Sequence, residues 1–507
     1  MARRFRFHGA VALAAFGLGA GKLPAHAQTT ATSAMAPAGM AAAGIQPVDT
    51  LTQALSVAYY NNAALQAQRA ALRQADENVP AALSGWRPTV ALSGSAGRVM
   101  GTQTTIVSTF LPAQVLPQNR DEIIGQATLT QPIFTGGKTT EATREAKNQV
   151  YAQRAQLLAT EGQVFLNVVT DYVTVVTDTR LVALDRNNVS VLRRQLQATK
   201  EQFNIGAITL TSVAQAEAAL AQATAQVAIA LGNLQIAREN FRHDVGQPPG
   251  DLTPPQPLLL PVSSQAAAGA LARQNNPNVI AAEFTNAANK DAVDVAFSAL
   301  LPQISLQAAG YIESGQSGPG TRLSGGSVLG QLSVPLYQGG QEYATIRQAR
   351  AKVQQSFAQI VDAERSADAQ AAQAFEGFVA SREAVVSTNA AIRANAIALD
   401  GTEREEIIGT RDTLDVLNAQ QLLLQSEEQQ VQNIANVVTE SYTVAAAIGR
   451  LTATDLGLPI RQYDDLKYYN AVKDAAFGTG ETADADAGLA PDGSLLPGVS
   501  PVDQPSP

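Results

Sequence analysis

Few side chains in this sequence could carry catalysis or hold a metal ion. None of the 507 residues is a cysteine, and the three histidines are His8, His26 and His243. The first two lie in an N-terminal stretch with the features of a cleaved secretion signal, so only His243 would remain in the mature chain. A thiolate site, a histidine-rich metal site and a Ser-His-Asp triad are therefore not expected. The sequence predicts no enzyme and no cofactor.

The one motif that suggests a ligand fails on its spacing. Gly137-Lys138-Thr139 resembles the end of a phosphate-binding loop, but that loop requires a glycine five positions before Gly137, where this chain has Pro132. The balance of charge also argues against nucleic acid as a partner. The net charge is −9, and it becomes −13 once residues 1–27 are removed, because they hold four basic residues and no acidic one.

The N-terminus predicts export. Residues 1–27 combine a basic start, an apolar segment at Val11–Leu18 and small residues on both sides of His26, as a signal peptide does. The apolar segment is too short to span a bilayer as a helix, although an uncleaved anchor is the alternative. Residues 28–47 and the acidic tail 478–507 are rich in small residues, glycine and proline, and are expected to be disordered. Without cysteine the chain is not expected to be a lipoprotein, and the mature chain has no apolar run long enough for a transmembrane helix.

The elements that would position any functional residue occur twice. The segment at 131–137 returns at 334–340, a shift of 203 residues, and Gly206 and Gly246 recur as Gly409 and Gly449 at the same shift. Upstream, the pairs at 61–62 and 275–276 are both Asn-Asn, 214 residues apart. Two tandem structural repeats are predicted at 48–250 and 265–458, with a proline-rich linker at 251–264 and an equatorial segment at 459–477.

Each repeat is predicted to hold a pair of strands, at about 88–132 and 302–335. Apolar and small polar residues alternate in four segments: Thr89–Val99, Ile123–Thr130, Gln303–Ala308 and Val328–Val334. This alternation suits strands with one face in lipid and the other in water, although an ordinary soluble hairpin has the same pattern. Polar loops are expected at Met100–Asp121 and Glu313–Gly325.

A long helical hairpin is predicted after each strand pair, at about 138–246 and 341–449. Residues 138–205 contain no proline and only one glycine, which at about 1.5 Å per residue gives a helix on the order of 100 Å long. Apolar residues recur at every seventh position from Val168 to Phe203, a spacing typical of helices that coil around partner helices. The chain is expected to reverse at Gly206 and Gly409.

Four strands are too few to close a barrel, which needs about eight. An open sheet edge in lipid would leave backbone groups without hydrogen bonds. If the strands enter a membrane, several copies must therefore share one barrel, and the long helices would continue that ring as a tube. The predicted fold class is a mixed α/β membrane protein with a β-barrel continued by an α-helical coiled-coil barrel.

The duplicated motifs resemble those of the TolC-like outer membrane channels of tripartite efflux pumps and type I secretion systems. The resemblance covers about residues 48–470 and rests on Pro-Ile-Phe-Thr-Gly-Gly at 132–137, Pro-Leu-Tyr-Gln-Gly-Gly at 335–340 and the hairpin tips at 206–213 and 409–419. It implies a homotrimer in the outer membrane of a Gram-negative bacterium, with a 12-stranded β-barrel of four strands per chain and a helical tunnel in the periplasm. It also implies two partners, a periplasmic adaptor (membrane fusion) protein and an inner-membrane transporter of the antiporter or ABC type.

The resemblance also places a periplasmic gate at the second hairpin tip. The family carries two acidic residues three positions apart on one helix face, and this chain keeps Asp415 but has Asn418 at the second position. We therefore expect one ring of carboxylates backed by a ring of amides, and weaker selectivity for cations. A solvated carboxylate near a helix start is the alternative reading of Asp415.

Arg411 matches the family arginine that holds the closed tip against a neighbouring hairpin. The position of its usual acidic partner is Ser212, beside Thr211, and the family's tip tyrosine is Glu406 in this chain. We expect Arg411 to pair with Glu406 or Thr211, with a solvated cation as the alternative.

Further expectations concern the tips and the strand-to-helix junctions. Adaptor contacts are expected at the tips, although simple turn chemistry would explain the same residues: Ile205, Gly206, Ile408 and Gly409. The junctions are assigned to Pro132, Gly136, Gly137, Pro335, Gly339 and Gly340. Beside them, Phe134 and Tyr337 suit a membrane interface, with core packing as the alternative. The competing function for the whole chain is a trimeric coiled-coil surface adhesin or structural spacer.

Overall fold

The computed structural model describes residues 48–105, 114–316 and 320–478, which all belong to one compact unit, Gln46–Pro507. The predicted signal peptide, the stretch 28–47 and all of the predicted acidic tail except Gly478 lie outside the described residues. The description begins just before α1 (Leu51–Asn61), whose N-cap is Thr50. The Thr50 side chain accepts a hydrogen bond from the Gln53 backbone N–H, and the Gln53 side chain returns to the cap backbone, which forms a capping box.

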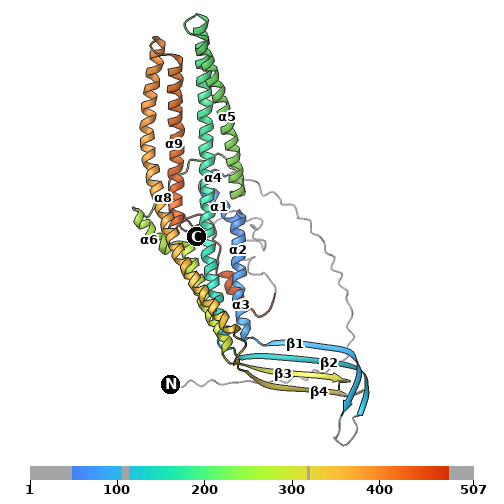
Figure 1. Ribbon diagram of the computed structural model, residues 1–507. Coiled ribbons are helices and arrows are strands. Elements are labelled where there is room, and N and C mark those ends of the chain that lie inside the picture. The colour runs from blue at the N-terminus through green and yellow to red at the C-terminus, as the bar shows by residue number, and fades with distance from the viewer. Residues whose placement is uncertain (1–47, 106–113, 317–319, 479–507) are drawn as a thin grey trace. The chain divides into compact units, whose positions relative to one another are not determined.

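Four antiparallel strands form one sheet in the order β1-β2-β3-β4 (Figure 1). They are β1 (Thr89–Thr105), β2 (Gln114–Phe134), β3 (Gln303–Ser314) and β4 (Arg322–Ser333). The four segments with alternating residues lie in these strands. The loop expected at Met100–Asp121 is partly wrong, because β1 continues to Thr105 and β2 already begins at Gln114. The extended part of this hairpin runs past the last β2–β3 pair, Ile123 with Ser314.

The strand register places many apolar residues of all four strands on one face, although Ile124 and Leu329 lie on the other. Val90 pairs with Leu129, Leu129 pairs with Ala308, and Ala308 pairs with Val328, so a continuous apolar row crosses the sheet. The opposite face is mainly small and polar, as the row Ser305 with Gln331 illustrates. The apolar face is open in the described chain, where Val90 and Val328 are 75% and 70% exposed. Within the described ranges both outer strands also leave one backbone edge without a partner strand.

Two helices of 67 residues follow the strand pairs, α4 (Lys138–Asn204) and α8 (Gln341–Ile407). Each turns back into a shorter helix, α5 (Leu210–Val245) or α9 (Thr413–Ala447). The predicted helical hairpins are thus present, and the unbroken helix expected over residues 138–205 ends one residue early. The heptad residues Val168, Val175 and Val182 are buried, whereas Phe203 near the tip is 40% exposed.

Shorter helices occupy the region between these hairpins and the sheet. The first half contributes α2 (Ala63–Asp76), α3 (Asn78–Leu83) and a short 3-10 helix at Ser84–Trp86. The second half contributes α6 (Gln265–Asn275), α7 (Pro277–Phe297) and a 3-10 helix at Ser298–Leu300. Helix α10 (Lys467–Val472) lies in the segment expected at 459–477. The expected linker at 251–264 has neither helix nor strand.

Helix α7 packs against both α4 and α8, and helix α9 does the same. Both therefore lie beside these two long helices. The larger buried cluster surrounds Phe165, Tyr172 and Phe241, all fully buried. A smaller cluster around Ala371, Val444 and Ile448 joins α8 and α9 to α6. Among the residues that the structure describes, no helix is both long and apolar enough to cross a membrane.

Candidate gate, hairpin tips and helix junctions

The first hairpin tip is a tight turn with exposed apolar residues. Helix α4 ends at Asn204, and Gly206 then adopts a left-handed φ of +77°. The Gly206 N–H donates to the Phe203 carbonyl and the Ala207 N–H to the Gln202 carbonyl, as a helix-terminating glycine turn requires. Ile205, just before the glycine, is 81% exposed. No atom lies within 4 Å of the place a Gly206 Cβ would take, so the backbone angle requires this glycine.

The second tip has the same geometry. Gly409 has a φ of +77°, and its N–H donates to the Glu406 carbonyl. Ile408 is 74% exposed, and Asp412 then caps α9 by accepting a hydrogen bond from the Asp415 N–H at 3.1 Å. Both tips therefore present an exposed apolar residue beside a glycine, and the adaptor contact expected there stays a prediction.

The ion pairs of Arg411 differ from the prediction. Its Nε donates to Glu405 Oε2 at 3.1 Å, and a terminal nitrogen lies 3.6 Å from Asp415 Oδ2. The hydrogen bond to Glu405, followed by the charge of Asp415, raises the pKa of the Arg411 guanidinium. Within one chain the expected pairing with Glu406 or Thr211 is wrong, because the turn at Gly409 brings residue 405 next to residue 411. Arg411 therefore forms its ion pairs within its own hairpin tip.

Asp415 lies in the first turn of α9, where the helix dipole favours a carboxylate. Its side chain is 39% exposed, so it is only partly covered by Arg411. Asn418, one turn further, is exposed. The structure thus brings Asp415 and Arg411 together and leaves Asn418 facing solvent in the described chain.

Thr211 and Ser212 belong to the first turn of α5. The helix is capped by Thr209, whose side-chain oxygen accepts from the Ser212 N–H at 3.4 Å. The Ser212 hydroxyl lies 3.3 Å from the Thr209 hydroxyl, and Thr211 is exposed. In the described part of the chain these two residues serve the start of α5 and do not contact Arg411.

In the described chain two polar side-chain contacts link one hairpin to the other, in addition to the apolar packing of α4 against α9. Near the tips, Gln195 of α4 donates to the Glu406 carboxylate at 3.4 Å. Further from the tips, Asp185 of α4 and Glu428 of α9 share a hydrogen bond. Burial is the main cause that raises the pKa of both carboxyls, and the charge of Asp185 raises the pKa of Glu428 further. One of these two carboxyls must therefore be protonated for the contact to be attractive, because two carboxylates repel each other.

The glycines at the strand-to-helix junctions have left-handed backbone angles. Gly137 and Gly340 are the residues before α4 and α8, with φ of +86° and +87°. Gly136 is also packed tightly, since a Cβ there would lie 2.9 Å from the Ser298 carbonyl oxygen, whereas Gly339 has open space. The two junctions differ at their prolines: Pro132 lies inside β2, and Pro335 lies beyond the end of β4. Phe134 and Tyr337 are 42% and 77% exposed, so the core-packing alternative fails in the described chain.

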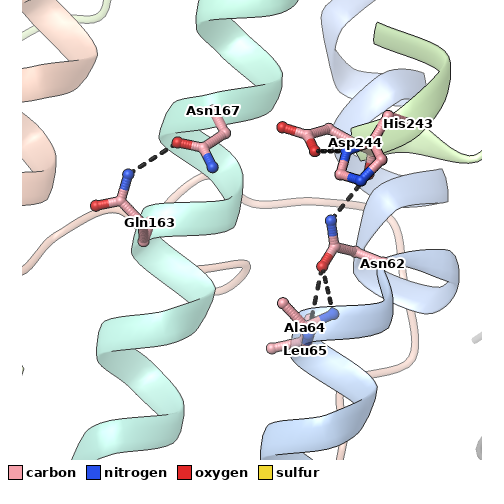
Figure 2. Close-up of polar contacts among 7 residues, drawn as sticks. All are labelled: Asn62, Ala64, Leu65, Gln163, Asn167, His243 and Asp244. Atoms are coloured by element: carbon pink, nitrogen blue, oxygen red, sulfur yellow. Dashed lines mark hydrogen bonds and ion pairs between the residues drawn. The ribbon is translucent and has the colours of Figure 1, made fainter. Parts of the chain in front are cut away.

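A single asparagine joins two helices end to end in each half. Figure 2 shows the first case, where Asn62 Oδ1 accepts from the N–H groups of Ala64 and Leu65 at the start of α2. Its Nδ2 donates at 3.0 Å to the carbonyl of Asp244, near the end of α5. In the second half Asn276 caps α7 in the same way and donates at 3.0 Å to the Ala447 carbonyl of α9. These residues come from the Asn-Asn pairs noted in the sequence, whose role was not predicted.

The surroundings of the two asparagines differ. Beside Asn62, Asp171 of α4 shares a hydrogen bond with Asp244, and the exposed His243 lies 2.7 Å from Asp244 (Figure 2 shows the latter pair). Burial, followed by the charge of Asp244, raises the pKa of Asp171 to about 7. Beside Asn276 there is instead a cavity of about 360 Å³ between α4, α8 and the α7–α9 junction. Its lining includes the small residues Gly162, Ala374 and Ala447 as well as the polar side chains of Gln373 and Glu440.

Comparison with known proteins decides the family. The family described as "Outer membrane efflux protein" matches residues 54–247 and 269–450. The chain belongs to the outer membrane efflux protein family. A 34% identical relative, the outer membrane efflux protein BepC of Brucella suis, aligns over 85% of this chain and 92% of its own length. The outer membrane protein TolC of Escherichia coli is 24% identical over half of this chain and 54% of its own length.

Solved structures show the same fold at lower identity. The CmeC outer membrane channel of Campylobacter jejuni superposes with a TM-score of 0.68 and 18% identity, over 79% of this chain and 86% of that chain. Membership of the outer membrane efflux protein family confirms the predicted resemblance and places the protein in the outer membrane. The family is one of channels, which agrees with the scarcity of catalytic side chains in the sequence.

Sequence reasoning missed several residues that the structure brings together. Glu405 and Gln195 were not predicted, because their contacts depend on the turn at Gly409 and on the packing of two hairpins. Asp171 and Asp244 are far apart in the sequence and meet only because α5 returns along α4. Only the helix-joining asparagines had a signal in the sequence, because Asn62 recurs as Asn276 at the same shift as the surrounding elements.

Proposed function

We propose that three copies of this chain form the exit duct of a tripartite efflux pump or type I secretion system. Each copy would contribute four strands to one 12-stranded barrel, and the helices would line a tunnel in the periplasm. The duct would be a passive conduit without catalytic activity. An adaptor protein and an inner-membrane transporter would supply docking and energy.

The observation that carries this proposal is the register of the sheet. Among the described residues it aligns apolar side chains of all four strands on one uncovered face and leaves β1 and β4 each with a free edge. Lipid suits the apolar face, and the free edges of neighbouring copies would satisfy each other's backbone groups. A surface adhesin does not require either feature, so the runner-up function loses support.

The two halves of the chain would act as quasi-equivalent units of the same ring. Support comes from the element bounds: α4 and α8 begin 203 residues apart and have equal lengths, and α1 and α6 begin 214 residues apart. Three copies would then give six similar units around the tunnel. Asp415 would form a ring of three carboxylates near the tips, each partly neutralised by its own Arg411.

Purified protein in planar lipid bilayers tests the proposal. We expect discrete conductance steps, and native mass spectrometry in detergent should give the mass of a trimer. Val328→Lys, on the apolar face, should cost about 2–4 kcal/mol in lipid and reduce insertion strongly. Ser327→Lys, on the polar face of the same strand, is the matched control and should insert normally. A monomer that stays soluble without detergent and conducts no ions would refute the proposal.

A further inference from the structure

The cavity beside Asn276 lies where α4 of the first half packs against α7, α8 and α9 of the second half. Helix α4 of the first half passes the α7–α9 junction of the second half, and Gly162 is the α4 residue that leaves space there. A Cβ built on Gly162 would lie 3.6 Å from the Leu451 carbonyl oxygen. A longer side chain at this position would therefore begin beside Leu451, which lines the cavity together with Ala374 and Ala447.

In a ring of quasi-equivalent units, the same contact recurs between copies. Helix α8 is the counterpart of α4 and would pass the α2–α5 junction of a second copy. At the shift of 203 residues the counterpart of Gly162 is Arg365, and the counterparts of Ala374 and Ala447 are Asp171 and Asp244. The three uncharged positions Gly162, Ala374 and Ala447 inside one chain thus correspond to an arginine and two carboxyls in the second contact.

Both sides of this second contact are incomplete in a single chain. Arg365 is exposed, and within the described ranges it has neither an ion pair nor a hydrogen bond. Asp171 and Asp244 share a hydrogen bond, and within the described ranges neither forms an ion pair with an arginine or a lysine. His243, whose side chain is 85% exposed, lies 2.7 Å from Asp244. Two adjacent carboxyls that lack a strong cation and a cation that lacks an anion are complementary.

We propose that Arg365 of one copy enters the α2–α5 junction of the next copy and pairs there with Asp171 and Asp244. The occupant of this surface is therefore a second copy of the same chain, and three such contacts would hold the trimer together at the level of the helix junctions. The inference rests on the proposed trimer. It also bears on specificity, because the contact inside one chain has Ala374 and Ala447 at the positions of Asp171 and Asp244 and so lacks this pair of carboxyls.

A neighbouring charge fits the same arrangement. Asp362 lies three residues before Arg365, and its counterpart Ala159 also lines the cavity. The counterparts of the cavity residues Pro277 and Asn278 are Ala63 and Ala64, in the first turn of α2. Asp362 would therefore face a helix N-terminus, where the dipole favours a negative charge.

Cross-linking tests the contact directly, because the chain has no cysteine of its own. The double variant Arg365→Cys with Asp171→Cys, treated in outer membranes with a short bis-maleimide, should give covalent dimers and trimers on denaturing gels. The control pair is Arg393→Cys with Asp171→Cys. Arg393 lies on the same helix, but its counterpart Ser190 is exposed in the contact within one chain, so this pair should remain monomeric on the gel.

A charge swap provides a second, independent readout. Arg365→Asp should increase the dissociated fraction of the trimer at least about tenfold at a fixed temperature, because it leaves three carboxyls together. Adding Asp171→Arg to the same chain should recover most of that loss. If the native protein is a trimer but neither cross-linking nor recovery occurs, the contact is refuted and the proposed function stands. If the native protein does not form a trimer, both proposals fail.

Discussion

Asn276 is predicted to hold α7 and α9 together through both ends of one amide. Its Oδ1 accepts from the Asn278 N–H at 2.9 Å, and its Nδ2 donates to the buried Ala447 carbonyl at 3.0 Å. Loss of an N-cap typically costs about 1 kcal/mol, and a buried carbonyl left without a donor costs about 1–3 kcal/mol. Asn276→Ala should therefore destabilise the junction by roughly 2–4 kcal/mol, which raises its local opening by about 30- to 1,000-fold.

Hydrogen–deuterium exchange of the assembled protein measures this opening at the end of α9 and in the first turns of α7. Asn276→Asp keeps the cap oxygen and removes only the donor, so it isolates the part of the loss that belongs to Ala447. Ser264→Ala is the matched control: it removes the single cap bond of α6, at 3.3 Å from the exposed Ser264, and should cost under about 1 kcal/mol. If Asn276→Ala speeds exchange no more than Ser264→Ala does, the asparagine does not join the helices.

Three further substitutions test other parts of the structure. Gly136→Ala should lower the dissociation temperature of the trimer more than Gly339→Ala, because both have positive φ but only Gly136 has backbone and side-chain atoms 2.9 Å from a built Cβ. The pKa of Asp185 is raised in the folded chain, whereas the unfolded chain loses this proton above about pH 4. The stability of the contact between Asp185 and α9 therefore falls as pH rises. Asp185→Asn should therefore reduce the difference in dissociation temperature between pH 5 and pH 8, and an unchanged difference would contradict this reading. Arg411→Ala should leave the dissociation temperature nearly unchanged because its ion pairs are exposed. It should nevertheless increase the cation selectivity that Asp415→Ala lowers, as measured by reversal potentials in a salt gradient.

The long helices were predictable because their signals are local and repeated. Proline is absent over residues 138–205, and glycines end the helices at Gly206 and Gly409, so the bounds of α4 and α8 follow within a residue or two. The far part of the β1–β2 hairpin was missed because it extends beyond β3, so no single buried face imposes alternation on residues 100–105. The partner of Arg411 was missed for a different reason. Glu405 precedes a glycine turn, and residues six positions apart become neighbours only through the left-handed geometry of Gly409.

The uncovered apolar face of the sheet has a consequence for biogenesis. A newly exported copy carries that face, together with the bare edges of β1 and β4, through an aqueous compartment before it meets lipid or other copies. Such edges are templates for aggregation. We therefore expect each copy to need its strands shielded in transit, and cells that lack periplasmic chaperones to lose this protein earlier than they lose exported proteins whose sheets are already closed.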